Sequence, residues 1–352
     1  MKRLRVLHLI DSLAAGGAER MAVNLCNLLN ERGTPAWLCA TRAEGPLLEM
    51  VADTDRYIFL EKRNALDFRA FTRLIRFIRR ERINVLHAHS SSLAWAVMAK
   101  YFADIKVVWH DHFGNSEFLD SRARLPIRLF TRSVDYVISV NEKLQRWAIE
   151  KLNIDEDKVS YLPNFPMLSP KQTRPDRHSK RDIPVIICTA NLRAAKDHHT
   201  LIKALALVRN DGIPFKLWLV GADFNDTYSR SLKQLIHERN LSGDVEFLGV
   251  RTDITDLLCQ ADIGVLSSVT EGLPVSLLEY GLAGLPVVAT AVGQVPEVVG
   301  ECGVVVPPKD VEALAAGLKK FLCDKERRRQ LGKKFNERVE ERYSAAPVYD
   351  LL

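Results

Sequence analysis

The stretch EGLPVSLLE at residues 271–279 places two glutamates on either side of a proline. Pro274 favours the first turn of a helix, because its missing amide proton would have no intrahelical partner there. We expect this helix to run from Val275 to about Leu282, so that Glu271 lies in the loop before it and Glu279 inside it. The amides of a helix N-terminus favour a phosphate between the two carboxylates. A capped helix with solvated glutamates is the alternative.

The surrounding sequence alternates short β-branched runs with longer amphipathic segments. The runs are RVLHLI, AWLCA, YIFL, NVLHAH, KVVWH and DYVISV in the first half, and PVIICTA, FKLWLVG, VEFLG, DIGVLSS, LPVVAT and GVVVP in the second. This alternation predicts an α/β protein with two doubly wound, Rossmann-like domains. Ligands of such sheets bind outside the carboxyl ends of the strands, so we expect the domains to face each other across a ligand-binding cleft.

The domain boundaries follow from length and from one irregular segment. A chain of 352 residues exceeds what one hydrophobic core usually serves, and SPKQTRPDRHSKRD interrupts the alternation with proline and charge. We therefore assign residues 1–168 to the first domain, 169–183 to a linker and 184–335 to the second domain. Residues 336–352 are expected to form a C-terminal helix that packs back on the first domain.

The amino-acid composition indicates the cellular compartment. The formal charge of +6 arises from 50 basic and 44 acidic side chains, which gives an anionic partner only weak support. The six cysteines form no CxxC pair, which argues against a zinc ribbon or a secreted disulfide framework and favours reduced thiols in the cytoplasm. His8 and Asp11 interrupt the first apolar run too early for a signal peptide. No apolar stretch reaches the roughly 20 residues that span a bilayer.

The segment EGLPVSLLE, followed by YGLAGLPVVAT and VGQVPEVV, closely resembles the E-x7-E region of the retaining glycosyltransferases of family four, also called group 1, which have the GT-B fold. The resemblance implies that Glu271 contacts the donor sugar and Glu279 holds the ribose hydroxyls. It implies that the diphosphate binds the intervening backbone at Gly272, Leu273, Pro274 and Val275. Gly293-Gln294 stands where the family often has two glycines, a departure that touches none of these roles.

Two glycine- and lysine-containing loops extend the resemblance. LAAGGAERMAVNL resembles the first strand-to-helix loop of the family, where Gly16 and Gly17 let the backbone approach a phosphate or acceptor. This loop lacks the dinucleotide G-x-G-x-x-G pattern, which argues against NAD. TANLRAAKDHHTL resembles the loop that neutralises the donor diphosphate: Lys196 matches the family lysine, and Asn191 stands where the arginine is usual. We expect Arg193 to take over the contact with the phosphates; a surface arginine is the alternative.

Two His-x-His pairs, His87 with His89 and His110 with His112, end two predicted neighbouring strands. Alternate residues of a strand share a face, so each pair can act together. The resemblance places His112 opposite the reacting sugar and His110 next in line, whereas hydrogen-bonded core or hinge positions are the alternative for His110 and His87. A zinc site is a further alternative, but the family needs no metal.

Two surface features concern the base and the acceptor. The strand end VEFLGVRTD resembles the part of the family that holds the nucleobase, so the resemblance places Leu248 to Arg251 in that pocket. The segment RAFTRLIRFIRRERI, residues 69–83, predicts a helix with one apolar face and one arginine face. The apolar face is expected to pack on the sheet. The arginine face is either solvated or lies on an anionic membrane near a lipid-linked acceptor.

The resemblance covers almost the whole chain and implies a retaining transferase of the hexosyl or N-acetylhexosaminyl type. Such an enzyme would move a sugar from a UDP- or GDP-sugar to a glycan or lipid-linked acceptor in polysaccharide, lipopolysaccharide or glycolipid biosynthesis, at the inner face of the cytoplasmic membrane. No cofactor, metal or nucleic acid is expected. A nucleotide-sugar 2-epimerase and a non-catalytic basic binding module remain alternatives. The sequence does not name the sugar, the base or the acceptor.

Overall fold

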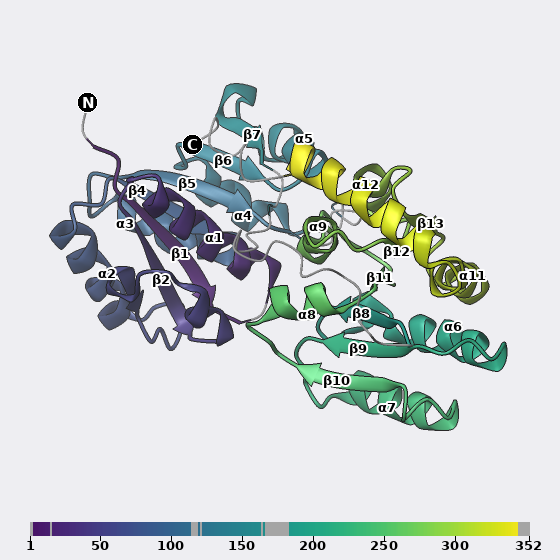
Figure 1. The fold of residues 1–352 in the computed structure, drawn as a ribbon. Coiled ribbons are helices and arrows are strands. Elements are labelled where there is room, and N and C mark those ends of the chain that lie inside the picture. Colours follow the sequence, from purple (N-terminus) through teal and green to yellow (C-terminus); the bar gives the residue numbers. More distant parts are fainter. Residues whose placement is uncertain are drawn as a thin grey trace. The chain divides into compact units, whose positions relative to one another are not determined.

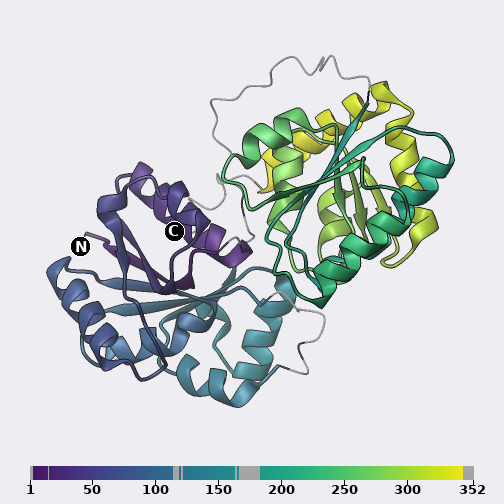
Figure 2. The same cartoon turned by 90° about the horizontal axis from the view of Figure 1, so that it is seen from below.

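The structure is a computed structural model that describes residues 3–14, 16–113, 119, 122–162, 165 and 183–343. The chain divides into two compact units, Met1–Pro163 and Asn164–Leu352. Each unit is an α/β sandwich in which helices cover both faces of one parallel sheet, as Figures 1 and 2 show for each unit separately. The predicted linker at 169–183 lies outside the described residues, apart from Ile183.

The first unit contains a seven-stranded sheet in the order β3-β2-β1-β4-β5-β6-β7, with every neighbouring pair parallel. The strands are β1 (Val6–Ser12), β2 (Ala36–Ala43), β3 (Tyr57–Phe59), β4 (Val85–His89), β5 (Lys106–Asp111), β6 (Tyr136–Ser139) and β7 (Val159–Tyr161). The helices are α1 (Gly17–Glu31), α2 (Phe68–Arg80), α3 (Leu93–Lys100), α4 (Arg124–Thr131) and α5 (Glu142–Leu152). The short 3-10 helices are η1 (Pro46–Met50), η2 (Thr54–Arg56), η3 (Ser90–Ser92) and η5 (Glu156–Lys158).

The second unit repeats this topology with six parallel strands in the order β10-β9-β8-β11-β12-β13. The strands are β8 (Val185–Thr189), β9 (Lys216–Val220), β10 (Val245–Gly249), β11 (Ile263–Leu266), β12 (Val287–Thr290) and β13 (Val304–Val306). The helices are η6 (Ala194–Lys196), α6 (His198–Asn210), α7 (Thr227–Glu238), α8 (Ile254–Gln260), α9 (Val275–Leu282), α10 (Val295–Val299), α11 (Val311–Leu322) and α12 (Lys325–Tyr343).

Apolar residues on both faces of each sheet form the cores. In the second unit, Ile186 and Val265 lie in a cluster with α6 and α11, whereas Ile187 and Leu266 lie in another with α9 and α12. Successive strand residues point to opposite faces, so a strand buried on both sides reads as one continuous apolar run. This is why the runs in the sequence predicted the strands. The doubly wound parallel fold is confirmed, as is the helix from Val275 to Leu282.

The C-terminal segment differs from its predicted boundary at 335/336. Helix α12 runs without a break from Lys325 to Tyr343, and Phe335, Val339 and Tyr343 are buried against the core beneath α9 in the second unit. Asn336 donates hydrogen bonds to the carbonyl oxygens of Gly281 and Leu282 at 3.2 and 3.0 Å. Residues 336–343 therefore belong to the second unit, because helix α9 needs their apolar side chains as its cover. Residues 344–352 lie outside the described part of the chain.

Among the described residues, the helices are all too short or too polar to cross a bilayer. All six cysteines are free thiols.

Candidate active site

Both sheets reverse their strand order at one point, and the predicted site residues follow the strands at these points. In the second unit the order reverses between β8 and β11, and Lys196 and Glu271 lie in the loops after those two strands. In the first unit it reverses between β1 and β4, whose carboxyl ends carry Asp11 and His89. Neighbouring loops diverge at such switch points and leave room for a ligand.

An ion pair lies at the switch point of the second sheet. The Lys196 Nζ donates to Glu271 Oε1 at 2.5 Å, and Ser268 Oγ donates to the same oxygen at 2.6 Å. The Glu271 side chain is 11% exposed and that of Lys196 28%. The loops that carry the pair are bound together, because Ser267 Oγ donates to the Lys196 carbonyl at 2.8 Å and Val269 N to that of Ala195 at 2.9 Å. The cation and the carboxylate are therefore held in place before any ligand binds.

Gly293 packs closely against the loop between Glu271 and α9. Gly293 has φ +51°, and a Cβ there would collide with the carbonyl oxygens of Glu271 and Gly272. The next residue, Gln294, donates its amide proton to the Gly272 carbonyl at 3.0 Å. Only glycine permits this close approach and this backbone conformation together. The family-like glycine at 293 therefore shapes the segment Gly272–Pro274, which ends with Pro274 as the N-cap of α9.

The second predicted carboxylate lies inside helix α9. Glu279 is 3% exposed. The helix that carries it is anchored by Tyr280, whose hydroxyl accepts the Thr189 amide proton at 2.7 Å and donates to the Val265 carbonyl at 3.3 Å. These bonds fix α9 against the ends of both central strands. The two glutamates thus flank the helix N-terminus, as the sequence predicted.

Arg193 and Asn191 take different places in the loop after β8. Asn191 Oδ1 accepts the Ala222 amide proton at 2.8 Å, which binds this loop to the one after β9. Arg193 is exposed and lies over the Phe224 ring, 4.8 Å from its centroid. Among the described residues Arg193 forms no ion pair, so its guanidinium is available to an anion. The Asn191 side chain thus supports the loop, and Arg193 is a second cation within it besides Lys196.

The residues predicted for the nucleobase lie at the end of edge strand β10. Leu248 is half-buried and packs against the core of the second unit. Arg251 forms a two-point ion pair with Asp253, with its Nε 2.7 Å from Oδ1 and its Nη2 2.5 Å from Oδ2. The guanidinium is therefore already engaged by a neighbouring carboxylate, which the sequence did not predict.

Five histidines form a continuous cluster on three adjacent strands of the first sheet. The register pairs His8 with His87 and His89 with His110. Three ring-to-ring hydrogen bonds follow: His8 Nδ1 with His89 Nε2 at 3.1 Å, His89 Nδ1 with His112 Nε2 at 3.0 Å, and His87 Nε2 with His110 Nδ1 at 3.3 Å. His112 is partly exposed and the other four are buried. His112 is therefore the member that can touch a ligand, and His110 is a hydrogen-bonded core residue.

The histidines are neutral. Burial lowers the pKa of His87 and of His112 to about 3. Burial, and then the neighbouring rings, hold the pKa of His8, His89 and His110 well below the usual value. The overlapping triads His8–His87–His89 and His89–His110–His112 each bring three ring nitrogens within 4.8 Å of one another. Neutral nitrogens at this range can approach a transition metal or bond to each other.

Two further polar clusters at the same edge were not predicted as site residues. Asp11 accepts hydrogen bonds from Thr41 at 2.7 Å, Ser91 at 2.7 Å and Lys62 at 3.1 Å. Burial pushes its pKa up, but these hydrogen bonds and the Lys62 charge outweigh it and lower the pKa. Asp111 forms a two-point pair with Arg122 at 2.6 and 2.8 Å. The position of Asp11 and Asp111 at strand ends could have identified them as site residues. The sequence analysis considered Asp11 only as an interruption of an apolar run.

The predicted glycine pair lies at the start of α1. Gly16 is the N-cap of α1, and Gly17 is its first residue. A Cβ at Gly16 would collide with the Glu19 carboxylate, whose Oε1 accepts from Ser12 Oγ at 3.3 Å. The absence of a side chain at 16 therefore lets Glu19 turn back toward the end of β1.

Two family profiles match consecutive parts of the chain. The Glycosyltransferase Family 4 profile matches residues 15–165, and the Glycosyl transferases group 1 profile matches residues 171–338. The N-acetyl-alpha-D-glucosaminyl L-malate synthase of Bacillus anthracis is 25% identical over 296 residues, which cover 80% of this chain and 76% of that protein. The GPI3 subunit of the phosphatidylinositol N-acetylglucosaminyltransferase of Saccharomyces cerevisiae is 25% identical over 255 residues, which cover 68% of this chain but only 55% of that protein.

Solved structures show the same fold. Anabaena Alr3699/HepE, crystallised in complex with UDP and glucose, superposes with a TM-score of 0.83 at 20% identity, covering 99% of this chain and 98% of that one. The likeness, together with the two parallel-sheet units, establishes the GT-B fold. The chain belongs to the group 1 glycosyltransferases of family four and is a transferase of the glycosyltransferase class.

Proposed function

We propose that this enzyme transfers a sugar from a UDP- or GDP-sugar to a glycan or lipid-linked acceptor, with retention at the anomeric carbon and without a metal. The observation that carries the proposal is the Lys196–Glu271 pair at the switch point of the second sheet, beside the N-terminus of α9. A nucleoside diphosphate leaving group needs stabilisation of developing negative charge. Lys196, Arg193 and the α9 terminus supply positive charge or dipole to it without a bound cation.

The proposed reaction balances without a protein nucleophile. The bond from the anomeric carbon to the diphosphate oxygen breaks, a bond from the acceptor oxygen to the same carbon forms, and the acceptor proton passes to the departing phosphate. Retention by two displacements would need a carboxylate about 5 Å from an acid, as in glycosidases. The Glu271 carboxylate instead accepts from Lys196 and Ser268, an arrangement suited to positioning the sugar. The chain's part is therefore orientation and electrostatic stabilisation.

Transfer should be measured with UDP, GDP and ADP sugars after a thermal-shift screen has identified the nucleotide, because a specific ligand stabilises the fold that binds it. The anomeric coupling in the proton NMR spectrum of the product reports retention, and a chelator tests metal independence. An inverted product, or activity abolished by the chelator and restored by magnesium, would contradict the proposal. A new sugar isomer formed from donor alone would favour the epimerase. Salt-sensitive binding of a polyanion with no nucleotide binding would favour a binding module.

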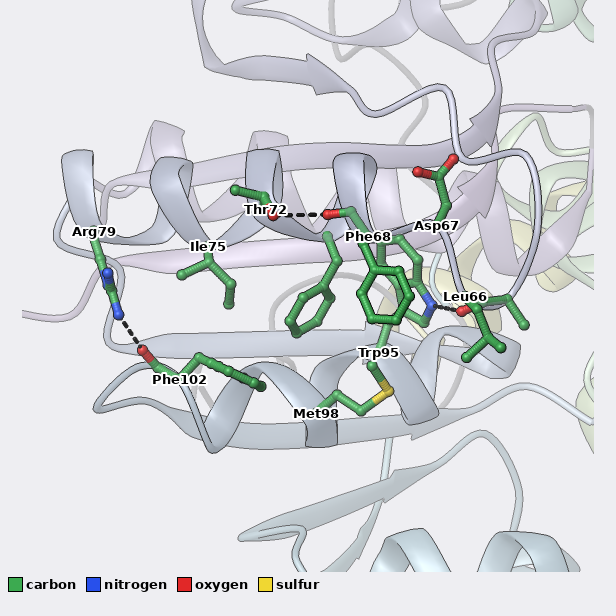
Figure 3. Close-up of a pocket in the computed structure, with 11 residues that line it drawn as sticks. Leu66, Asp67, Phe68, Thr72, Ile75, Arg79, Trp95, Met98 and Phe102 are labelled. Carbon is green, nitrogen blue, oxygen red and sulfur yellow. Dashed lines mark hydrogen bonds between the residues drawn. The ribbon is translucent and has the colours of Figure 1, made fainter.

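A groove between α2 and α3 supports a lipid-linked acceptor and contact with an anionic membrane. The groove has a volume of about 340 Å³ and is lined mainly by apolar side chains, among them Phe68, Phe71, Trp95, Met98 and Phe102. Figure 3 shows Phe68, Met98 and Phe102 gathered between the two helices. Phe68 is 76% exposed and Phe102 56%, and an apolar patch this exposed is typical of a contact surface.

The arginines of α2 divide into two groups, which sharpens the membrane proposal. Arg73 donates to the carbonyl oxygens of Phe59 and Leu60, so it is not part of a solvated basic face. Arg69, Arg76, Arg79 and Arg80 are exposed. Arg79 also donates to the Phe102 carbonyl at 2.9 Å and closes one end of the groove. Exposed aromatic rings beside arginines are suited to the surface of anionic lipid.

Vesicle flotation tests this contact. Wild-type protein should float with vesicles that contain phosphatidylglycerol and remain below with pure phosphatidylcholine. The Leu66→Ser/Phe68→Ser variant should lose most of the bound fraction. Its matched control is Leu125→Ser/Leu129→Ser, which removes two side chains of similar exposure on α4. Equal loss in both variants, or binding that is independent of lipid charge, would contradict a role for the groove.

A further inference from the structure

Three of the clustered rings form a single hydrogen-bonded chain that ends at the surface. His8 bonds to His89 through Nδ1, and His89 bonds to His112 through its own Nδ1. Both ring nitrogens of His89 are therefore engaged. A neutral imidazole carries one N–H and one lone pair, so the proton of His89 must point toward one neighbour and its lone pair toward the other. The proton positions of the three rings are thereby linked, and only two arrangements exist.

His8, at the buried end of the hydrogen-bonded rings, selects between the two proton arrangements. His8 Nε2 is buried and has no hydrogen-bond partner in the described part of the molecule. In one arrangement this atom carries a proton that finds no acceptor, and in the other it carries only a lone pair. Unpaired buried N–H groups are rarer in native proteins than unpaired acceptors. The lone pair therefore lies on Nε2 of His8, and its proton lies on Nδ1 and is donated to His89.

We infer that His8 and His89 are positioning residues that hold His112 in the tautomer protonated on Nδ1. His8 donates to His89 Nε2, His89 donates from Nδ1 to His112 Nε2, and His112 is left with its proton on Nδ1. The second pair follows the same rule, because His110 Nε2 is also buried without a described partner and His110 therefore donates from Nδ1 to His87. The low pKa of each buried ring agrees with neutral tautomers throughout the cluster.

The tautomer sets what His112 can do. Among the described residues its Nδ1 has no partner, so this N–H is available to a lone pair of the substrate. His112 is thus a hydrogen-bond donor to an oxygen of the substrate, on the proposed function to a hydroxyl or ring oxygen of a sugar. It is not a general base at Nδ1. Moving a proton along the chain would end at His8 Nε2, which is buried and has no described acceptor.

The use of both His89 nitrogens favours this hydrogen-bonded chain over a metal site. Zinc binds imidazole nitrogens at about 2.0–2.1 Å in a tetrahedron, which places the ligand nitrogens about 3.3 Å apart. The bonded nitrogens are 3.0, 3.1 and 3.3 Å apart, so the distances fit both arrangements and the bonding pattern decides. His89 belongs to both triads and uses a different nitrogen for each bonded neighbour. Pairwise bonding explains the short distances without an ion.

The experiment is a two-bond proton–nitrogen correlation spectrum of the full chain labelled with nitrogen-15 in histidine, recorded near pH 7.5. Single variants assign the rings. His8, His89 and His112 should each show the protonated nitrogen at Nδ1, and the wild-type spectrum alone decides this. A proton on Nε2 of His112 would overturn the inference. So would stoichiometric binding of added zinc chloride that shifts the His89 and His112 signals.

Two variants of His8 separate positioning from packing. His8→Asn keeps an N–H donor near the position of Nδ1, and His8→Asp, which has nearly the same size, offers only acceptor oxygens there. In His8→Asp, His89 must donate from Nε2 and accept at Nδ1, so the His112 signal should move toward the Nε2-protonated form, and kcat/KM for sugar transfer should fall about tenfold, the effect of one hydrogen bond. His8→Asn should keep the wild-type His112 signal and activity. Unchanged His112 signals in a folded His8→Asp protein would also overturn the inference. The spectrum is independent of activity, so loss of the proposed reaction leaves the tautomer result standing.

Discussion

The carboxyl ends of the two sheets have the same topology but carry different side chains. In the second unit a lysine and a glutamate meet at 2.5 Å beside a helix N-terminus, and an arginine is exposed nearby. In the first unit the corresponding switch point carries neutral imidazoles beside the Asp11 carboxylate, which is paired with Lys62. Fold alone therefore does not decide what a switch point binds, because the side chains at the strand ends do. The end with Lys196 and Arg193 suits a diphosphate, and the end with the imidazoles suits hydroxyl groups.

A fall in pH should destabilise the first unit, and this is the largest effect that we expect. Burial lowers the pKa of His87 and His112 to about 3, while the unfolded chain titrates near 6.5. Below pH 6.5 the unfolded state binds more protons than the folded state, so stability is fully present above pH 6.5 and is lost as the pH falls toward 3. Each such histidine contributes about 1.4 kcal/mol per pH unit in that window.

Tryptophan fluorescence can follow this loss, because Trp37, Trp95, Trp109 and Trp147 lie in the first unit and only Trp218 lies in the second. Urea unfolding detected by fluorescence should show a midpoint that drops steeply between pH 7 and pH 5. His87→Asn should flatten this dependence. A midpoint that does not change with pH would mean that the rings take up protons in the folded state.

Removal of the carboxylate should have the largest effect on catalysis. Glu271→Ala is expected to lower kcat by about 10²–10³-fold, the usual loss when an aligned group at a transition state is removed. Steady-state transfer assays measure this. Glu246→Ala on exposed strand β10 is the control of equal charge change. Near-normal turnover of Glu271→Ala would remove Glu271 from the site, and folding should be verified by circular dichroism.

One added methyl group at Gly293 should lower both stability and nucleotide affinity. Gly293→Ala introduces a Cβ at positive φ and against two backbone carbonyls, so we expect a loss of stability of about 1–3 kcal/mol and weaker nucleotide binding. Gly243→Ala is the matched control, because a Cβ there meets nothing within 4 Å and the backbone is unstrained. Denaturant titration measures both. Equal stability of the two variants would show that the loop adjusts freely.

The smallest expected effect belongs to the lysine. Lys196→Gln should raise the Kd for the nucleoside diphosphate about tenfold, because one charge-assisted hydrogen bond is lost while Arg193 and the α9 terminus remain. Calorimetry measures this change, and Lys203→Gln on the exposed side of α6 is the control. An unchanged Kd would place the diphosphate away from Lys196 and contradict its assignment to the switch point of the second sheet.

Much of the fold could be predicted because it follows from local patterns. Strands buried on both faces read as apolar runs, and Pro274 marked the start of α9. The boundary at 335/336 differed because α12 continues across it, and the reason is tertiary: Phe335 and Val339 cover α9. A charged helical sequence does not reveal which element its few apolar residues will meet.

Much of the candidate site was also local in sequence. Glu271, Lys196 and Arg193 follow strands, and the His-x-His pairs lie at strand ends. Parallel strands bring their carboxyl ends to one edge. Ser268, Gly293, Asp11 and His8 were missed as site residues because their importance arises from contacts with distant segments. No spacing rule links residue 8 to residue 89, yet neighbouring strands place His8 Nδ1 3.1 Å from His89 Nε2.

The sequence by itself determined the doubly wound units, the glutamates that flank a helix start, and the family. These depend on periodicity and on residues close in the chain, for which backbone geometry leaves few alternatives. Only the tertiary structure decided which groups are charged and where their protons lie. The pKa of a histidine depends on whether other segments exclude water from it, and the proton of His112 depends on a buried atom of residue 8. Solvation and hydrogen-bond partners are properties of the folded chain.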